Sequence, residues 1–427
     1  MKQEIIRLFD QTQANRLELE ALKNQNFKHP EMGILRFQML KPRQAARDTG
    51  VDKLCRTFSA WSHVVAMLYA QFSHSIGLND VCDSLWLHSG PLSAIRGATP
   101  PSRNGLSHAG KHRNAEMAEQ LFWSMLRHLQ ALSPGFAGSK RSKGLLHRFR
   151  ATIHIVDSTT IELVASCMDW AKHRRRKAAA KCHMRLDLQS FLPVFVLVDS
   201  AKQSDPKHAR AVCLGLSAGE IVVFDRAYVD FGHLFELDGR GVFWVTRTKS
   251  NLRFRVVKRR HKKNTNPKIL ADDEVVVLNK NSRQKYPRRM RRVRALVEVD
   301  GQEREMEFLT NNMEWSSQSV ADLYRSRWAI ENFFKQIKQT LKLADFLGHS
   351  ANAVRWQIWS ALLCYLLLRY QAFLTSWGHS FTRLFTLLRS VLWQKIDLLD
   401  LLRSCGTAGG SYRALATPEQ AYFPNFA

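Results

Sequence analysis

The sequence predicts an α/β fold in which helices cover a β-sheet, and three stretches carry this prediction. Residues 151–163 are rich in β-branched side chains, which favour strands. Residues 220–229 contain a short continuous apolar run, which is typical of a strand buried on both faces. A helix candidate at 231–237 then separates this strand from another at 241–249. Strands mixed with helices in this way indicate a sheet covered by helices.

Helical segments are also predicted on both sides of these strands. Residues 1–148 are mainly helix-like. Within them, the basic stretch 97–129 suits a DNA-reading helical unit and an ordinary helical bundle equally well. Two further strands, broken near Ser190, are predicted within 183–200, and after residue 312 the chain is helical again.

A basic, β-rich stretch interrupts this pattern between about 251 and 304. Apolar and polar residues alternate on both sides of Asp300-Gly301, which indicates a hairpin. Residues 253–294 carry 16 Lys and Arg against 3 acidic residues, so this stretch holds close to half of the chain's net charge of +27. We therefore expect a β-rich insertion with a concentrated positive surface.

The charge of the whole chain restricts the kind of partner. The 64 Lys and Arg outnumber the 37 acidic residues, which points to a polyanion, most simply nucleic acid. The longest apolar run, 358–368, is about half of a bilayer span, so we expect a buried helix and no membrane partner. The N-terminus lacks the apolar core of a signal peptide. The seven cysteines include no C-x-x-C pair, which suggests a reducing cytoplasm.

Two aspartates stand out because each lies where a buried strand is expected to emerge from the sheet. Asp157 lies in IVDST, and Asp225 lies in VVFDRAY. A carboxylate at the end of a buried strand is costly unless it is paired or holds a metal. Other roles stay open for both residues: Asp157 could cap a helix, and Asp225 could pair with Arg226 or with a distant arginine.

A third carboxylate lies in the stretch YRSRWAIENFFKQIKQ, residues 324–339. This stretch carries Tyr324, Arg327, Glu331 and Lys338. On one continuous helix these four would form a single stripe opposite an apolar face, and such a stripe is usually only a solvated, salt-bridged surface. Together with the two aspartates, however, Glu331 could complete an oxygen-ligand site for Mg²⁺ or Mn²⁺. Two such ions can cut a phosphodiester without a covalent protein nucleophile.

These ordered motifs resemble those of insertion-sequence transposases of the family typified by insertion sequence four. The spacing Y-x2-R-x3-E-x6-K matches the signature of that family, and VDST and FDRAY are similar to the segments that carry its two catalytic aspartates. Ala227 departs from the pattern, because a glycine is frequent at that position. The resemblance covers roughly residues 60–370.

The resemblance implies a ribonuclease-H-like catalytic core with a β-strand insertion, flanked by N- and C-terminal helical regions. It carries over Asp157, Asp225 and Glu331 as a catalytic triad that binds Mg²⁺ or Mn²⁺, with two ions per active site. The residues expected to contact DNA phosphates are Tyr324, Arg327, Lys338 and Arg226.

Five regions are expected on this basis. They are a helical DNA-binding region at 1–148, the first part of the catalytic core at 149–250, the basic insertion at 251–304, the second part of the core at 305–350, and a helical region at 351–427.

The expected function is transposition: the protein would cut DNA at the ends of its own insertion sequence and join the 3′-hydroxyl ends to target DNA. Two basic groups would hold the duplex, namely Arg174, Arg175, Arg176 and Lys177, and Arg288, Arg289, Arg291 and Arg292. The first group could instead be loose, disordered charge. We expect a homodimer assembled on double-stranded DNA, in the cytoplasm and associated with the nucleoid.

Three alternatives keep part of this interpretation. The protein could be a metal-dependent nuclease without strand transfer, or a catalytically silent DNA-binding regulator derived from a transposase. A tyrosine recombinase that uses Tyr324 would leave the strand-end aspartates unexplained.

Overall fold

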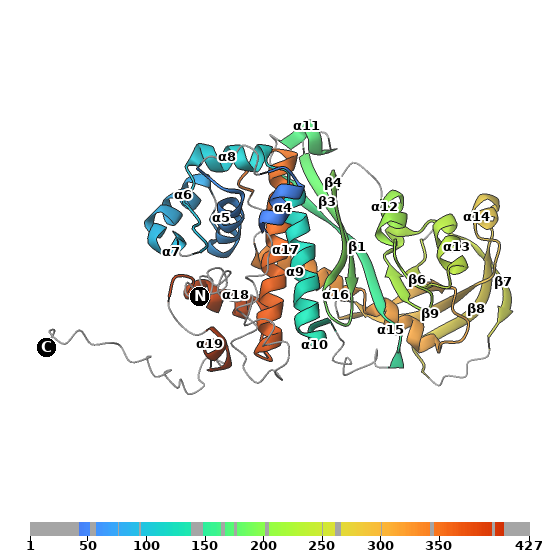
Figure 1. The fold of residues 1–427 in the computed structure, drawn as a ribbon. Coiled ribbons are helices and arrows are strands. Elements are labelled where there is room, and N and C mark those ends of the chain that lie inside the picture. Colours follow the sequence, from blue (N-terminus) through green and yellow to red (C-terminus); the bar gives the residue numbers. More distant parts are fainter. Residues whose placement is uncertain are drawn as a thin grey trace, which may run out of the picture. The chain divides into compact units, whose positions relative to one another are not determined.

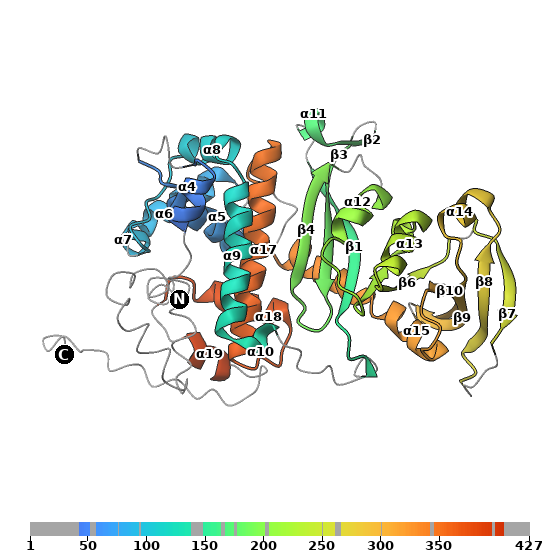
Figure 2. The same cartoon turned by 45° about the vertical axis from the view of Figure 1, so that its right-hand side comes forward.

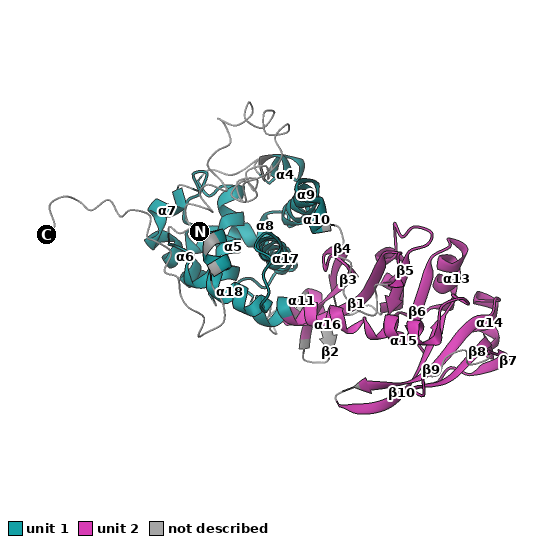
Figure 3. Cartoon of the chain, turned by 90° about the horizontal axis from the view of Figure 1, so that it is seen from below, with its two compact units in different colours: residues 1–136, 336–427 teal, residues 137–335 magenta. Residues whose placement is uncertain are grey.

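The computed structural model describes residues 42–51, 57–75, 77–93, 95–137, 148–163, 167–174, 177–200, 205–249, 251–260, 266–299, 301–341, 346–394 and 398–404. The chain divides into two compact units (Figure 3). One unit combines residues 1–136 with 336–427, and the other comprises residues 137–335.

Every described element of the first unit is helical (Figure 1). The elements are α4 (Pro42–Asp48), α5 (Ala60–Ser73), α6 (Leu78–Leu87), α7 (Ser89–Ser93), α8 (Arg103–His112), α9 (Glu116–Leu132), α10 (Pro134–Ala137), a π-helical turn (Gln336–Thr340), α17 (Ala351–Leu374), α18 (Phe381–Ser390) and α19 (Leu398–Ser404). The long helix α17 contacts α5, α8, α9 and α18, so segments from both ends of the chain share one core. This confirms the predicted buried helix at 358–368. None of the described helices combines the length and the apolarity of a membrane span.

The described strands of the second unit form one ten-stranded sheet (Figure 2). They are β1 (Ile153–Leu163), β2 (Lys172–Arg174), β3 (Lys177–Asp187), β4 (Pro193–Ser200), β5 (Ile221–Phe224), β6 (Phe243–Arg247), β7 (Phe254–Arg259), β8 (Ile269–Val277), β9 (Met290–Val299) and β10 (Gln302–Thr310). The order is β2-β3-β1-β5-β6-β10-β9-β8-β7, with β4 beside β3. The β1–β5 and β5–β6 pairs are parallel and the other pairs are antiparallel, so the sheet is mixed.

Helices accompany this sheet, which confirms the predicted α/β class. They are α11 (Met168–Ala171), α12 (Asp205–Val212), α13 (Phe231–Gly239), α14 (Lys280–Lys285), α15 (Ser317–Arg325) and α16 (Trp328–Lys335). The strand β5 is buried at all four positions, as its apolar sequence predicts. Its alternate residues enter two cores: Val222 and Phe224 pack with α12 and α13, whereas Ile221 and Val223 pack with α15.

The basic stretch also folds as strands. The antiparallel pair β9–β10 sets Val299 opposite Gln302, which confirms the hairpin. Through β10, which pairs with β6, the strands β7 to β9 continue the same sheet as the central strands.

Two expectations about local structure were wrong. Asp157 is not at the end of its strand, because β1 continues to Leu163 by pairing with β3. The stretch 324–339 is not one helix either: α15 ends at Arg325, α16 begins at Trp328, and a π-helical turn starts at Gln336. At the first break the Ser326 hydroxyl donates to the carbonyl of Leu323 at 2.6 Å, a local bond that competes with helical continuation.

Candidate active site

The register of β1 and β5 gives Asp157, which lies within β1, and Asp225, which directly follows β5, equivalent positions on neighbouring segments. The last residues that these parallel strands pair are Val156 and Phe224, and each aspartate is the next residue along the chain. Val156 and Phe224 both belong to the core that packs with α12 and α13. Since successive side chains of a strand alternate between faces, the aspartates turn toward the opposite face, which α15 covers.

The helix α15 and the turn that follows it supply polar partners for both carboxylates. The Tyr324 hydroxyl donates to Oδ1 of Asp225 at 3.4 Å. The Arg327 guanidinium donates from Nη1 to Oδ2 of Asp157 at 2.9 Å and from Nη2 to Oε1 of Glu331 at 2.6 Å. The Arg327 guanidinium also lies 5.7 Å from the centre of the Tyr324 ring. One arginine therefore joins a strand-borne acid to the helix-borne acid.

Burial makes this cluster electrostatically unusual. The Asp157 side chain is 16% exposed, and burial raises the pKa of its carboxyl to about 6, although Arg327 and the Ser158 amide favour the charged form. Burial also raises the pKa of Tyr324 to about 12, so its hydroxyl stays protonated. For Arg327, burial opposes the charged form, but the neighbouring Tyr324 and the acids together raise its pKa. The Arg327 guanidinium is therefore a cation between the Asp157 and Glu331 carboxylates, and the Asp157 carboxylate takes up a proton more readily than an ordinary aspartate.

The three carboxylates do not form a closed metal cage in this arrangement. Glu331 is 52% exposed and reaches Asp157 through Arg327. Within the described residues, no group of three or more His, Cys, Asp and Glu side chains is placed to hold a metal ion. The guanidinium instead supplies the positive charge between Asp157 and Glu331. The carboxylate oxygens remain the donor type that hard divalent cations prefer.

Two other predicted phosphate contacts, Arg226 and Lys338, lie on separate elements. Arg226 begins the 3-10 turn directly after Asp225 and is exposed. Lys338 lies in the π-helical turn Gln336–Thr340, which belongs to the other unit.

The predicted basic groups have different positions in the fold. Arg288 and Arg289 are 60% and 58% exposed, and they pair with Asp238 and Glu274. Arg291 does not fit the prediction of a DNA-facing residue, because its side chain is 2% exposed and bonded to Asp272.

Arg292 is 17% exposed and pairs with Asp273. In the other group, Arg175 and Arg176 lie outside the described residues, and Arg174 and Lys177 lie on β2 and β3.

The sequence interpretation missed a polar cluster on the opposite face of the sheet. The Ser158 hydroxyl donates to Asp205 at 3.1 Å, and Nδ1 of His183 lies 2.7 Å from the Tyr228 hydroxyl. One sequence signal was available: Ser158 and Tyr228 lie within the VDST and FDRAY segments themselves.

Comparison with known proteins places the chain in one class, the insertion-sequence transposases. The family called Transposase DDE domain matches residues 148–367, and a domain of unknown function (DUF4372) matches residues 37–95. The chain belongs to the transposase DDE domain family.

Relatives come from several bacteria. A Sinorhizobium fredii protein named as a transposase, y4zB, is 31% identical over 276 residues, which are 64% of this chain and 76% of that protein. A Geobacillus stearothermophilus protein named as the transposase of insertion sequence element IS5377 is 26% identical, over 60% of this chain and 66% of its own length. Transposase InsG of insertion sequence element IS4 from Escherichia coli is 24% identical, over 44% and 42%.

Among solved structures, the piggyBac transposase in a synaptic complex with hairpin DNA aligns with 92% of this chain and 89% of its own. The TM-score is 0.42 and the sequence identity is 8%.

Proposed function

We propose that this protein cuts DNA at the ends of its own insertion sequence and joins the resulting 3′-hydroxyl ends to target DNA, on a ribonuclease-H-like core. The observation that carries the proposal is the β1–β5 register, which sets Asp157 and Asp225 at equivalent positions on one face of the sheet. Arg327 connects Asp157 to Glu331, and the Tyr324 hydroxyl donates to Asp225. Membership in the transposase DDE domain family supports the proposal.

The donor set fits Mg²⁺ or Mn²⁺, because all three acidic residues offer carboxylate oxygens and a cationic group already lies between two of them. We assign Asp157, Asp225 and Glu331 as the residues that would hold two ions. When bound, such ions supply an activated hydroxide and stabilise the charge on the leaving oxygen.

The other residues would place the phosphate. In the described arrangement, Arg327 neutralises Asp157 and Glu331. If Asp157 and Glu331 were neutralised by divalent ions, the planar guanidinium of Arg327 would be free to hold a DNA phosphate through two parallel hydrogen bonds. Tyr324 holds Asp225 in place. Lys338 and Arg226 add positive charge for neighbouring phosphates.

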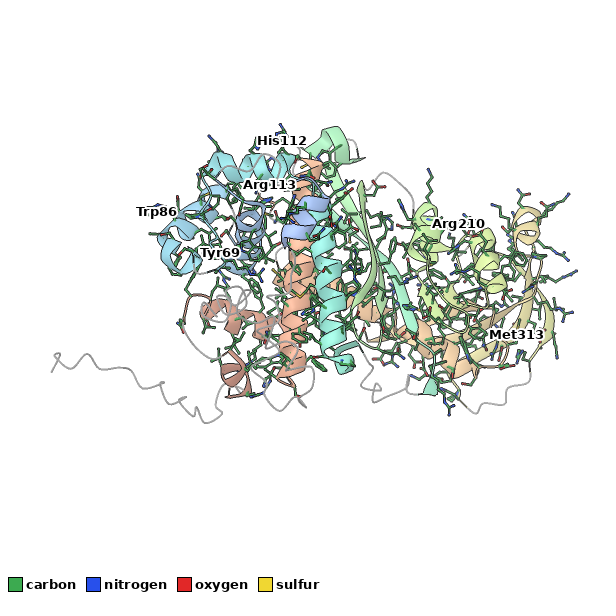
Figure 4. All side chains as sticks on the ribbon, viewed as in Figure 1. Tyr69, Trp86, His112, Arg113, Arg210 and Met313 are labelled. Atoms are coloured by element: carbon green, nitrogen blue, oxygen red, sulfur yellow. The ribbon has the colours of Figure 1, made fainter. Side chains whose placement is uncertain are left out.

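The helix α8 is our candidate for contact with double-stranded DNA in the helical unit. Leu106 and Ala109 bury one side of it, and the helix contains no acidic residue. Its exposed positions are Arg103, Asn104, Ser107, His108, Lys111 and His112. His112 lies near the end of this helix, beside Arg113 (Figure 4). The positively charged side chains of this face could contact DNA phosphates, and its amide and hydroxyl side chains could contact the edges of bases. A homodimer assembled on two DNA ends, in a cytoplasm where the DNA is accessible, completes the proposal.

The test compares two half-exposed glutamates that each pair with an arginine. Glu331→Gln should abolish metal-dependent cleavage of a plasmid that carries the inverted-repeat ends, while end binding in a gel shift stays within about twofold. Glu305→Gln removes a comparable surface charge, paired with Arg294, and should leave both unchanged.

The possible outcomes separate the alternatives. Cleavage by Glu331→Gln at a tenth of the normal rate or more would refute the triad. Binding without any cleavage by the unmodified protein would identify a silent regulator, and cleavage without joining would identify a nuclease.

A further inference from the structure

Behind the two aspartates, on the opposite face of the sheet, lies a largely buried polar cluster that the proposed chemistry does not use. We call the residues Ser158, His183, Asp205 and Tyr228 the clamp. Nδ1 of His183 lies 2.7 Å from the Tyr228 hydroxyl and 3.6 Å from Oδ1 of Asp205. The same Asp205 oxygen accepts from the Ser158 hydroxyl at 3.1 Å and pairs with Lys181 at 2.6 Å.

The sheet register explains why these residues meet. Ser158 follows Asp157 on β1, so its side chain turns to the other face. His183 is the cross-strand partner of Ser158 on β3, and directly paired residues share a face. Tyr228 ends the 3-10 turn that begins after Asp225, and Asp205 lies in the first turn of α12, which packs on the same face.

His183 and Tyr228 are the internal members of the clamp, and the bond between them joins neutral groups. His183 is 0% exposed and Tyr228 is 1% exposed. Burial lowers the pKa of His183 to about 4 and raises the pKa of Tyr228, so neither is charged near neutral pH. A buried hydrogen bond of this kind is geometrically demanding, because neither partner can turn to water instead.

The position of the clamp matters because the pairing between β1 and β5 ends just before the aspartates. The pairing of β1 with β5 stops at Val156 and Phe224, and Asp225 then leaves the sheet into the 3-10 turn. Beyond that point, the His183–Tyr228 bond ties the end of this turn to the β1–β3 strand pair that carries Asp157. One end of the bond, Tyr228, lies three residues after Asp225. The other end, His183, lies on β3 opposite Ser158, the residue after Asp157.

We propose that the hydrogen bond between Tyr228 and His183 is a positioning contact that sets the spacing of the Asp157 and Asp225 carboxylates for divalent cations. Tyr228 and His183 act through the aspartates and touch neither the cation nor the DNA. The inference rests on the proposed assignment of Asp157 and Asp225 as cation ligands. Loss of the Tyr228 hydroxyl frees the turn after Asp225 and loosens a site whose ligands need fixed geometry.

The experiment measures Mn²⁺ affinity of the full chain without DNA, from the electron paramagnetic resonance signal of free Mn²⁺. Tyr228→Phe keeps the ring and removes the hydroxyl, and we expect about tenfold weaker Mn²⁺ binding. The matched control is Tyr286→Phe, a tyrosine that is 2% exposed and packs between Phe235 and Trp244 in the same unit. This control should bind Mn²⁺ like the unmodified protein.

Thermal unfolding in EDTA separates positioning from general stability. If Tyr228→Phe binds Mn²⁺ as tightly as the unmodified protein, the inference is overturned, whatever its melting temperature. It is also overturned if both tyrosine variants weaken Mn²⁺ binding in proportion to their loss of melting temperature.

Failure of the proposed function would be seen separately. The unmodified protein would then bind Mn²⁺ through a Tyr228-dependent site and yet leave DNA ends uncut. An unmodified protein that binds no Mn²⁺ would overturn the inference and the assignment of the ligands together.

Discussion

Arg327 and Arg291 lie in the same unit, and both are buried arginines bonded to aspartates, but their surroundings differ. Arg291 is 2% exposed and holds both oxygens of Asp272, at 2.8 and 2.7 Å, and it also donates to the carbonyl of Trp315 at 2.5 Å. Arg327 instead divides its two terminal nitrogens between Asp157 and the half-exposed Glu331.

The two aspartates respond in opposite ways. For Asp272, burial alone would raise the pKa, but the hydrogen bonds from Arg291 and Ser317 lower it overall. For Asp157, burial prevails and the pKa rises to about 6 despite Arg327. The Arg291 pair is a completed structural bond, whereas the Arg327 pair leaves its aspartate poorly stabilised as an anion. A buried arginine beside an acid is therefore weak support for function, and an incompletely satisfied acid is stronger support.

Removing each arginine should produce the largest contrast. Arg291→Ala should cost about 3 to 5 kcal/mol of unfolding free energy, because Asp272 is left buried without its partner, while cleavage per folded molecule is unchanged. Arg327→Ala should lower single-turnover cleavage of a labelled DNA end by about a hundredfold through loss of phosphate placement. Its stability should change less, since Glu331 is half exposed and Asp157 can take up a proton.

Urea unfolding and cleavage assays on the same preparations would check this contrast. If both variants lost the same stability and Arg327→Ala cleaved DNA normally, the Arg327–Asp157 pair would be a structural pair like Arg291–Asp272.

The pH dependence of stability should differ in sign between the two aspartates. The pKa of folded Asp157 lies above its unfolded value of 3.8, so the folded state binds the extra proton between about pH 4 and 6. Its contribution to stability is therefore present below pH 4 and is lost as the pH rises through 6, by about 3 kcal/mol. Asp272, whose pKa is lowered, contributes stability that is lost as the pH falls below its unfolded value.

Urea unfolding in EDTA from pH 3 to 7 would measure both effects. Asp157→Asn should gain stability relative to the unmodified protein as the pH rises from about 4 to 6, and Asp272→Asn should show no such gain. A flat difference for Asp157→Asn would mean that burial does not dominate at Asp157.

The smallest effect concerns arginines that remain at the surface. Replacing Arg288 and Arg289 together by alanine should weaken DNA binding and reduce the slope of log affinity against log salt by up to about two units, close to one for each phosphate contact. Arg210→Ala on α12 is the matched control, because Arg210 is 54% exposed and also paired with a glutamate (Figure 4). Filter binding at several salt concentrations would measure the slopes, and equal slopes for both variants would place Arg288 and Arg289 away from DNA.

Much of the fold followed from local pattern. The four buried residues of β5, the β9–β10 hairpin and the helix at 231–237 were predicted correctly, because side-chain periodicity and turn chemistry act over a few residues. The chemistry-bearing residues Asp157, Asp225 and Glu331 were also identified from the sequence, through strand context and motif spacing. Their role as a metal-binding triad stays a proposal.

What the sequence determined by itself was therefore the kind of elements, the surplus of positive charge and the residues able to do chemistry. Only the tertiary structure decided that β3 pairs with β1 on both sides of Asp157, that Arg291 is buried against Asp272, and that Arg327 links Asp157 to Glu331. The physical reason is that periodicity fixes which face a side chain occupies, while strand partners and burial depend on residues distant in the chain. For Arg327 and Asp157 that distance is 170 residues.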